Sequence, residues 1–214
     1  MLGASRDDCL LSYLPLCHVA EKIFSLFLPL TTGAVVHFGE SIETVQQDLA
    51  EVSPTVFLGV PRIWEKMHAQ VTLKMQDASW LKRTLYKFFM PRGQAIADRR
   101  RNGTSGVWDN CVAWLGDMLV FRALQERLGL RRCRLPVSGA APISPELLKW
   151  FHGIGVLIGE GYGQTESTGA SHLNQPGAVR IGTVGQLIPG MECKIAEDGE
   201  ILLDMQAEAS RLLL

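Results

Sequence analysis

The chain has 214 residues, which is enough for one sizeable core and at most one or two domains. Hydrophobic residues make up 47% and charged residues 20%, a globular composition that excludes a disordered chain. The formal net charge of -1 gives no overall attraction to nucleic acid or to an anionic membrane, so we expect no nucleic-acid partner. The short basic cluster 99–101 is interpreted as a solvated loop.

The five cysteines are odd in number and widely spaced, which indicates neither a disulfide framework nor a zinc site. We therefore predict reduced, mostly buried thiols in a cytoplasmic protein. No signal-peptide apolar region opens the chain. The apolar run 23–36 contains Pro29 and is shorter than the roughly 20 residues of a bilayer span. We expect no transmembrane segment, which leaves peripheral membrane contact open.

Strand and helix patterns alternate in the first third of the chain. Short apolar runs at 10–13, 34–38 and 55–58 predict strands, the second of them buried. Segments 19–30 and 42–52 have the apolar spacing of helices. This alternation predicts an α/β fold whose mostly parallel sheet is covered by helices.

The middle of the chain, about 63–130, has few strand signals and is predicted to be a helical insertion. Its first helix surrounds Trp64 to Met75, and its second covers 80–97 with a break expected at Pro91. A loop rich in glycine and polar residues follows at 102–106, and a third helix covers 107–128.

The alternating pattern then returns. A strand is predicted at 134–137, and a helix at 145–153 is capped by Ser144. A second strand is predicted at 156–159. Segments 191–195 and 200–203 flank Asp-Gly and predict a hairpin, so the C-terminal stretch is β-rich.

The glycine-rich segment 159–169 carries side chains suited to a nucleotide. Gly161 and Gly163 allow the backbone to approach a ligand closely, and Tyr162 can stack on a base. Thr165 offers a hydroxyl to a phosphate oxygen, and Glu166 offers a carboxylate suited to Mg²⁺. By chemistry alone, a glycine-rich turn with an exposed acid explains these residues equally well.

Two common nucleotide motifs are excluded by spacing. A dinucleotide fingerprint requires Gly-x-Gly-x-x-Gly, but the third residue after Gly163 is Glu166. A phosphate loop of the Walker type requires Gly-Lys-Ser/Thr, and the sequence contains no such triplet.

Segment 161–166 (GYGQTE) resembles the adenylate-forming superfamily, which includes acyl-CoA synthetases and firefly luciferase. Further segments match in the family's order: 13–21 (YLPLCHVAE), 60–66 (VPRIWEK), 138–142 (SGAAP) and 182–185 (GTVG) with the later Gly-Glu-Ile. The resemblance covers about residues 7–203. About 70 residues separate Lys66 from Ser138, and this long helical link is similar to that of long-chain and bubblegum-like synthetases.

The resemblance implies an AMP-forming long-chain fatty acid–CoA ligase. In the family reaction a fatty acid carboxylate attacks the α-phosphate of ATP, which gives acyl-adenylate and pyrophosphate. The thiol of coenzyme A then displaces AMP. The resemblance therefore implies ATP, fatty acid and coenzyme A as substrates and Mg²⁺ as cofactor.

The resemblance also implies site residues. Thr165, Glu166 and His18 are the implied catalytic residues, with Glu166 as the metal ligand. The implied nucleotide-binding residues lie in two segments: Gly139, Ala140 and Ala141 in the first, and Glu160, Gly161, Tyr162, Gly163, Gln164 and Thr165 in the second. An ordinary strand-to-helix turn at 139–141 and a purely structural His18 remain the alternatives.

Residues 1–203 are interpreted as part of an AMP-binding domain, an internal piece of the family's large N-terminal domain. The family's phosphate loop, ribose-binding aspartate and C-terminal catalytic lysine have no match in the sequence, and the tail 204–214 diverges from the family pattern. We therefore expect little or no ligase activity from this chain alone. A non-catalytic nucleotide- or acyl-binding module and a decayed remnant are the alternatives.

Overall fold

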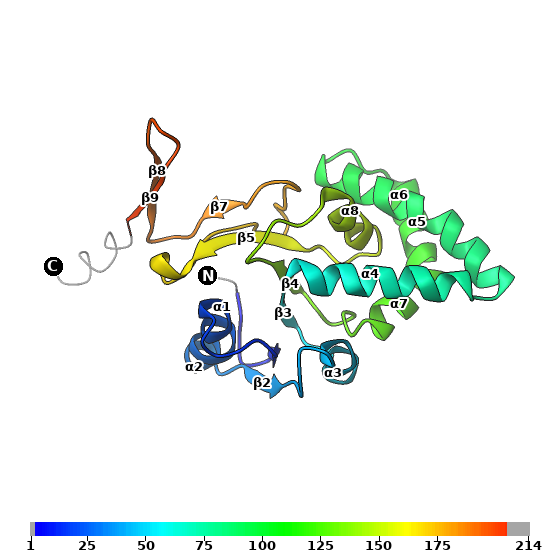
Figure 1. The fold of residues 1–214 in the computed structure, drawn as a ribbon. Helices are drawn as coiled ribbons and strands as arrows, with labels where there is room; N and C mark the ends of the chain where they lie inside the picture. Colours follow the sequence, from blue (N-terminus) through cyan, green and yellow to red (C-terminus); the bar gives the residue numbers. More distant parts are fainter. Residues whose placement is uncertain (1–2, 205–214) are drawn as a thin grey trace.

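The computed structural model describes residues 3–204, which form a seven-stranded sheet and a separate hairpin (Figure 1). The strand order is β2-β1-β3-β4-β5-β6-β7; the pairs from β2 to β5 are parallel, and β6 and β7 are antiparallel. The strands are β1 (Cys9–Ser12), β2 (Val35–Phe38), β3 (Val56–Gly59), β4 (Leu135–Ser138), β5 (Gly159–Gln164), β6 (Gly169–Leu173), β7 (Gln186–Leu187), β8 (Glu192–Ile195) and β9 (Ile201–Asp204). The predicted mostly parallel α/β fold and the hairpin are confirmed.

Helices make up most of the rest of the described chain. They are α1 (Val19–Lys22), the π-helical η1 (Ile23–Phe27), α2 (Leu28–Thr32), α3 (Val45–Val52), α4 (Pro61–Gln76), α5 (Trp80–Arg101), α6 (Val107–Gly116), the π-helical η2 (Asp117–Phe121), α7 (Arg122–Arg127), α8 (Pro145–Gly153) and the short 3-10 turn η3 (Thr165–Ser167). Within residues 3–204, none of these helices has the length and apolar character needed to cross a membrane.

Helices cover both faces of the sheet because alternate strand residues point to opposite sides. Leu10 and Val56 lie in one apolar cluster, to which Phe24 and Leu28 of η1 and α2 also belong. Their chain neighbours Leu11 and Phe57 belong to the second, larger cluster on the other face. That larger cluster includes residues of α3, α4, α5 and α8, so the main core lies between the sheet and these helices.

Trp64 is the central side chain of the larger cluster. It is fully buried, and its ring meets Phe57 and Phe151 edge to face with centroid distances of 5.4 and 5.2 Å. Its indole N–H donates to the carbonyl of Gly59 at 3.0 Å, so the one polar atom of the ring is satisfied. Trp64 therefore joins α4 to the carboxyl end of β3.

Two predictions about burial are wrong. Strand β2 was expected to be buried, but it is an edge strand, with Val35 53% and Phe38 74% exposed. The thiols were expected to be mostly buried, but Cys17, Cys111 and Cys193 are exposed. In both cases an apolar residue type was taken to mean burial, and residue type alone does not decide burial.

Helix α5 also differs from its prediction, because it passes through Pro91 without a break and ends at Arg101. Pro91 lacks an N–H for the carbonyl of Lys87, and both residues lie on the exposed side, where water reaches that carbonyl. The basic cluster 99–101 is the last turn of this helix and not a loop. There Arg99 forms two hydrogen bonds with Asp109 of α6, at 2.6 and 2.8 Å.

The strand predicted at 156–159 begins only at Gly159, so the glycine-rich segment is itself the strand. The apolar residues before it bond to the end of α8 instead of the sheet. The N–H of Val156 donates to the carbonyl of Phe151 at 2.9 Å, and His152 Nε2 lies 3.0 Å from the carbonyl oxygen of Ile158. Val156 and Ile158 are therefore core residues packed against α8, whereas Leu157 between them is 50% exposed.

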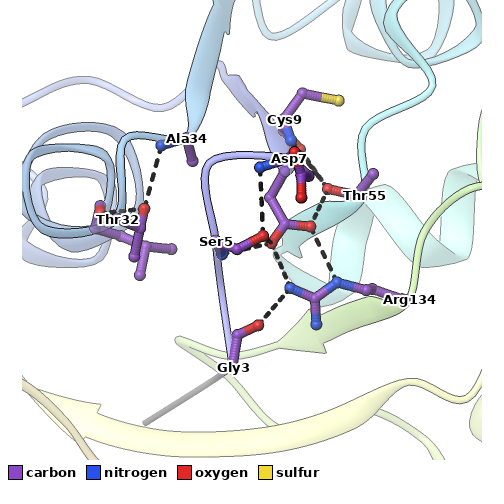
Figure 2. A network of polar contacts seen from close by, with 10 residues as sticks. Gly3, Ser5, Asp7, Cys9, Thr32, Ala34, Thr55 and Arg134 are labelled. Atoms are coloured by element: carbon purple, nitrogen blue, oxygen red, sulfur yellow. Dashed lines mark hydrogen bonds and ion pairs between the residues drawn. The ribbon is translucent and has the colours of Figure 1, made fainter.

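A polar network joins the N-terminal segment to the amino ends of β3 and β4 (Figure 2). The buried carboxylate of Asp8 pairs with Arg134 and accepts hydrogen bonds from the hydroxyl of Thr55 at 2.7 Å and the N–H of Ser5 at 2.8 Å. Arg134 also donates to the carbonyl of Gly3 at 2.8 Å. The hydrogen bond from Arg134, with those from Thr55 and Ser5, holds the pKa of Asp8 well below its usual range.

Asp8→Asn is expected to lower the free energy of unfolding by about 2 kcal/mol, because it removes a charge-assisted pair and leaves the guanidinium without its anion. The Arg134 side chain is 42% exposed, which limits the loss. Urea denaturation at neutral pH measures this change. Asp7→Asn, at an exposed neighbour, is the control and should change stability by less than about 0.5 kcal/mol.

The same network predicts how the free energy of unfolding changes at acid pH. The folded-state pKa of Asp8 is lowered, so its contribution is complete above the unfolded value of about 3.9 and is lost as pH falls below it. The difference in stability between the parent and Asp8→Asn should therefore shrink as pH falls from 5 toward 2, measured by urea denaturation at each pH; a constant difference would contradict the assignment.

Strands β5 and β6 approach closely at Gly163, which provides a second test. A Cβ at Gly163 would lie 2.0 Å from the carbonyl oxygen of Gly169 and 2.6 Å from the Cα of Ala170, both rigid backbone atoms. Gly163→Ser is expected to lower the free energy of unfolding by about 1–3 kcal/mol. Gly106→Ser is the matched control, since a Cβ there meets nothing within 4 Å. Equal stability of the two variants in urea would contradict the close approach.

Candidate functional site

Several of the segments singled out in the sequence meet at the carboxyl edge of the parallel strands, the usual position of ligand sites in such sheets. Strands β4 and β5 pair in parallel, with Ser138 opposite Glu160. This register places Gly139 beside Gly161, and a Cβ on Gly139 would lie 3.6 Å from the carbonyl oxygen of Gly161. The two predicted nucleotide-binding segments are therefore side by side.

The turn after β4 has the strained geometry often found at functional sites. Ala140 has a φ of 71°, a left-handed conformation that is costly for a residue with a Cβ. Ala140 and Ala141 are exposed at this edge. The hydroxyl of Ser138 is buried and has no hydrogen-bond partner among the described residues. Sequence reasoning included Ser138 in the motif but did not select it as a site residue.

Beyond β4, strand β5 continues toward the predicted metal-binding end. Residues 161–164 extend past the pairing with β4 and pair only with β6. Four extended residues cover at most about 13 Å, so Thr165 lies at most that far along the chain from Gly161. The turn at Gly139 and the residues Thr165 and Glu166 could therefore contact opposite ends of one elongated ligand.

A buried serine, Ser167, stabilises the turn that carries Thr165 and Glu166. The hydroxyl of Ser167 donates to the carbonyls of Gln164 at 3.1 Å and Gly169 at 3.0 Å. Thr168 takes the left-handed conformation that ends the turn, with a φ of 58°. Gln164, Thr165 and Glu166 are left exposed. No sequence pattern marks Ser167, because serine occurs commonly in loops.

Asn174, the residue after β6, contacts β5 from its other side, since its backbone N–H donates to the carbonyl of Glu160 at 3.0 Å. Its side chain donates to the carbonyl of Thr183 at 2.5 Å and accepts from the N–H of Arg180 at 2.9 Å. The carboxylate of Glu160 accepts from the N–H of Gly182 at 2.9 Å, and burial raises the pKa of Glu160. In this structure Glu160 therefore joins β5 to the GTVG segment, and its nucleotide contact stays a prediction.

Tyr162 is half-buried on β5, and its ring lies 6.0 Å from that of His172 on β6. The neighbouring strand thus limits the positions that the Tyr162 ring can take. Its predicted stacking on a base stays a prediction.

The Glu166 carboxylate fits a magnesium site of the kind found with nucleotides. Glu166 is exposed, and its carboxylate makes no hydrogen bond or ion pair within the part of the chain that the structure describes. The same part contains no cluster of three His, Cys, Asp or Glu side chains suited to a metal. Mg²⁺ commonly takes one or two protein carboxylates and completes its shell with phosphate oxygens and water, so one carboxylate is sufficient.

His18 is exposed and begins α1, where its Nδ1 accepts a hydrogen bond from the N–H of Ala20 at 3.2 Å. This bond gives His18 a capping role. Helix α1 and the η1 turn that continues it pack on β6, since a Cβ on Gly169 would lie 2.0 Å from Cδ1 of Ile23. His18 therefore starts a helix that touches the turn of Thr165, and a catalytic role for it stays a prediction.

Two surface cavities lie away from these residues. One, of about 630 Å³, is bounded by α5, α6 and α8, and the other, of about 690 Å³, lies next to it; Arg101 and Val179 line both. The three arginines of the first cavity are already bonded, Arg100 to Asn110, Arg101 to Asp98 and Arg131 to Asp117. We place the candidate site at the sheet edge because the chemistry-bearing residues lie there.

Comparison with curated proteins gives consistent relatives. The chain is 37% identical over 209 residues to a putative fatty-acid–CoA ligase, fadD11, of Mycobacterium tuberculosis, covering 95% of this chain and 36% of the relative. It is 32% identical over 205 residues to the long-chain-fatty-acid–CoA ligase ACSBG2 of Xenopus laevis, covering 92% and 27%. The chain thus spans about a third of the length of these relatives.

Solved structures share the fold at low sequence identity. A benzoate CoA ligase from Burkholderia xenovorans superposes with a TM-score of 0.57 at 21% identity, covering 94% of this chain and 32% of that one. The o-succinylbenzoate CoA synthetase of Bacillus subtilis, solved with ATP and magnesium ion, gives 0.56 at 16% identity, covering 94% and 31%. A sequence profile of the family described as AMP-binding enzyme matches residues 2–206, and the chain therefore belongs to that family.

Proposed function

We propose that this chain contributes the adenylate-binding part of an AMP-forming fatty acid–CoA ligase. The observation that carries the proposal is the pairing of β4 with β5, which sets the turn at Gly139 beside the glycine-rich strand at Gly161. Membership of the AMP-binding family supports a nucleotide as the ligand of this edge. The relatives named as long-chain-fatty-acid–CoA ligases support a long-chain acid as the second substrate.

The proposed roles are those that the resemblance implies, and the place of these residues at one edge of the sheet supports them. Gly139, Ala140 and Ala141 border the adenine, with Tyr162 against its face. The hydroxyl of Thr165 donates to a phosphate oxygen, and the carboxylate of Glu166 holds Mg²⁺. Bound there, the ion would offset the negative charge that builds on the phosphate oxygens. Fixed donors at this edge orient the α-phosphate for attack by the fatty acid carboxylate.

The second half-reaction needs coenzyme A, whose thiol displaces AMP from the acyl-adenylate. We propose that His18 lies near the acyl carboxylate, because the helix that it begins touches the turn after Thr165. The Nδ1 of His18 is already an acceptor, so Nε2 is the nitrogen left for a substrate oxygen.

The proposed setting is the cytoplasm, with peripheral contact at a membrane. The five cysteines, all within the described residues, form no disulfide, as is usual for proteins of a reducing compartment. Long-chain fatty acids partition into bilayers, so a ligase that lies against a bilayer reaches its substrate there.

Binding of Mg·ATP to this chain tests the proposal. Glu166→Gln is expected to weaken Mg·ATP binding roughly 10- to 100-fold while leaving metal-free ATP binding unchanged, because only the metal contact is lost. Isothermal titration with and without Mg²⁺ measures both affinities. Glu197→Gln, at an exposed position of the β8–β9 hairpin, is the matched control and should bind as the parent does.

Three results would count against the proposal. They are no ATP binding by the folded parent chain, the same loss in Glu197→Gln, and a loss in Glu166→Gln that is equal with and without Mg²⁺. Robust fatty acid–dependent ATP–pyrophosphate exchange by this chain alone would contradict the expectation that it has little or no ligase activity by itself.

A further inference from the structure

Helices α5 and α6 concentrate positive charge in a chain that is nearly neutral. Residues 80–122 contain eight Lys and Arg but only three Asp and Glu, a net charge of +5, while the whole chain carries -1. The remaining residues therefore carry -6. Such segregation gives one end of the molecule a strong positive potential although the total is near zero.

The acids of this segment are already neutralised by neighbours. Asp109 pairs with Arg99 at 2.6 Å, and Asp98 pairs with Arg101 at 2.5 Å. The third acid, Asp117, pairs with Arg131 at 2.8 Å. In contrast, Lys82, Arg83, Lys87 and Arg92 of α5 are exposed and have no acidic partner in the described part of the chain. Their charge is therefore free to attract an anionic surface.

The same two helices expose most of the chain's tryptophan. Trp80, Trp108 and Trp114 are 73%, 83% and 64% exposed, whereas Trp64 and Trp150 are buried. The exposed apolar residues of α6 and η2 recur at helical spacing and form one stripe along the helix. The stripe consists of Trp108, Trp114, Leu115 and Met118. An apolar helix stripe that faces water is costly unless something covers it.

Aromatic and basic groups are also combined on α5. The guanidinium of Arg92 lies 3.6 Å from the centre of the Phe88 ring, and Phe88 is 48% exposed. Long basic side chains beside exposed aromatic rings are typical of helices at the boundary between lipid headgroups and acyl chains, where the ring enters the boundary and the cation remains among the headgroups.

We propose that α5 and α6 form a docking surface for an anionic lipid bilayer. We define the docking surface by Trp80, Phe88, Trp108, Trp114, Leu115 and Met118. Charge complementarity selects this occupant, because α5 carries four cations without an acidic partner, while the three acids of the segment are all paired within the described residues. The inference rests on the peripheral membrane contact of the proposed function and names the surface that makes it.

The position of the surface suits a docked enzyme. In Figure 1, α5 and α6 lie at one end of the molecule, whereas α1 and the end of β5, which carry the candidate site, lie at the other. A bilayer on α5 and α6 would therefore leave the carboxyl edge of the sheet open to nucleotide.

Vesicle co-sedimentation tests the docking surface. The chain should bind vesicles of phosphatidylcholine mixed with phosphatidylglycerol and bind pure phosphatidylcholine far more weakly. Lys82→Gln with Lys87→Gln should lower the partition coefficient roughly thirtyfold, since each cation near an anionic surface contributes about 1 kcal/mol. Lys22→Gln with Lys194→Gln is the control for two exposed cations elsewhere and should bind as the parent does.

The apolar residues of the docking surface are tested by a double variant and a matched control. Trp108→Ser with Trp114→Ser should weaken binding at least about tenfold, because less apolar surface enters the membrane. Leu30→Ser with Phe38→Ser removes two side chains that are each 74% exposed, away from the docking surface, and should have no effect. Tryptophan emission should shift to the blue on vesicle binding in the parent and shift less in the tryptophan variant.

Each other outcome overturns the inference. Equal binding to both vesicle types would show that charge does not select the surface. Failure to bind anionic vesicles would reject a lipid occupant, and a dimer that the tryptophan variant abolishes would identify a second copy of the chain instead. Mg·ATP titration of the same variants separates this result from the proposed function, since nucleotide binding should be unchanged in all of them.

Discussion

The parallel pairing of β4 with β5 is the constraint on which the candidate site depends. Ser138 opposite Glu160 fixes the register, and a shift of one residue would move Gly139 away from Gly161 and turn every side chain of β5 to the other face. Strand β5 is also held at Glu160, whose carboxylate accepts from the N–H of Gly182 and whose carbonyl accepts from the N–H of Asn174. These contacts hold the strand in place, so the turn after it is presented at a defined position.

Local chemistry made some elements predictable from sequence. Ser144 before Pro145 marked the start of α8, and Asp198-Gly199 marked the hairpin, because each of these signals acts within a few residues. The strand at 156–159 was misplaced because its hydrogen bonds go back to α8, a tertiary choice that apolar residue type does not encode. The exposure of β2 likewise depends on its place at the sheet edge.

The candidate site was predictable only as a set of motifs. The candidate ligand-binding residues were predicted because GYGQTE and SGAAP resemble a family, whereas the residues that position them in the structure were not predicted. Ser167 and Asn174 are common residue types with no motif, and their roles follow from contacts made across the fold. Ser138 is the intermediate case. The motif contains it, but only the structure shows that its hydroxyl is buried without a hydrogen-bond partner among the described residues.

The two ends of the molecule differ in the residue types that they expose. At the carboxyl edge, glycine allows strands β5 and β6 to approach closely, since a Cβ on Gly163 would lie 2.0 Å from the carbonyl oxygen of Gly169. On α5 and α6 the opposite holds, since long basic and aromatic side chains extend outward from a regular helical backbone. The helices between β3 and β4 can carry such a surface without disturbing the sheet, because Phe89 and Met90 of α5 and Phe121 of η2 make the core contacts from the other side.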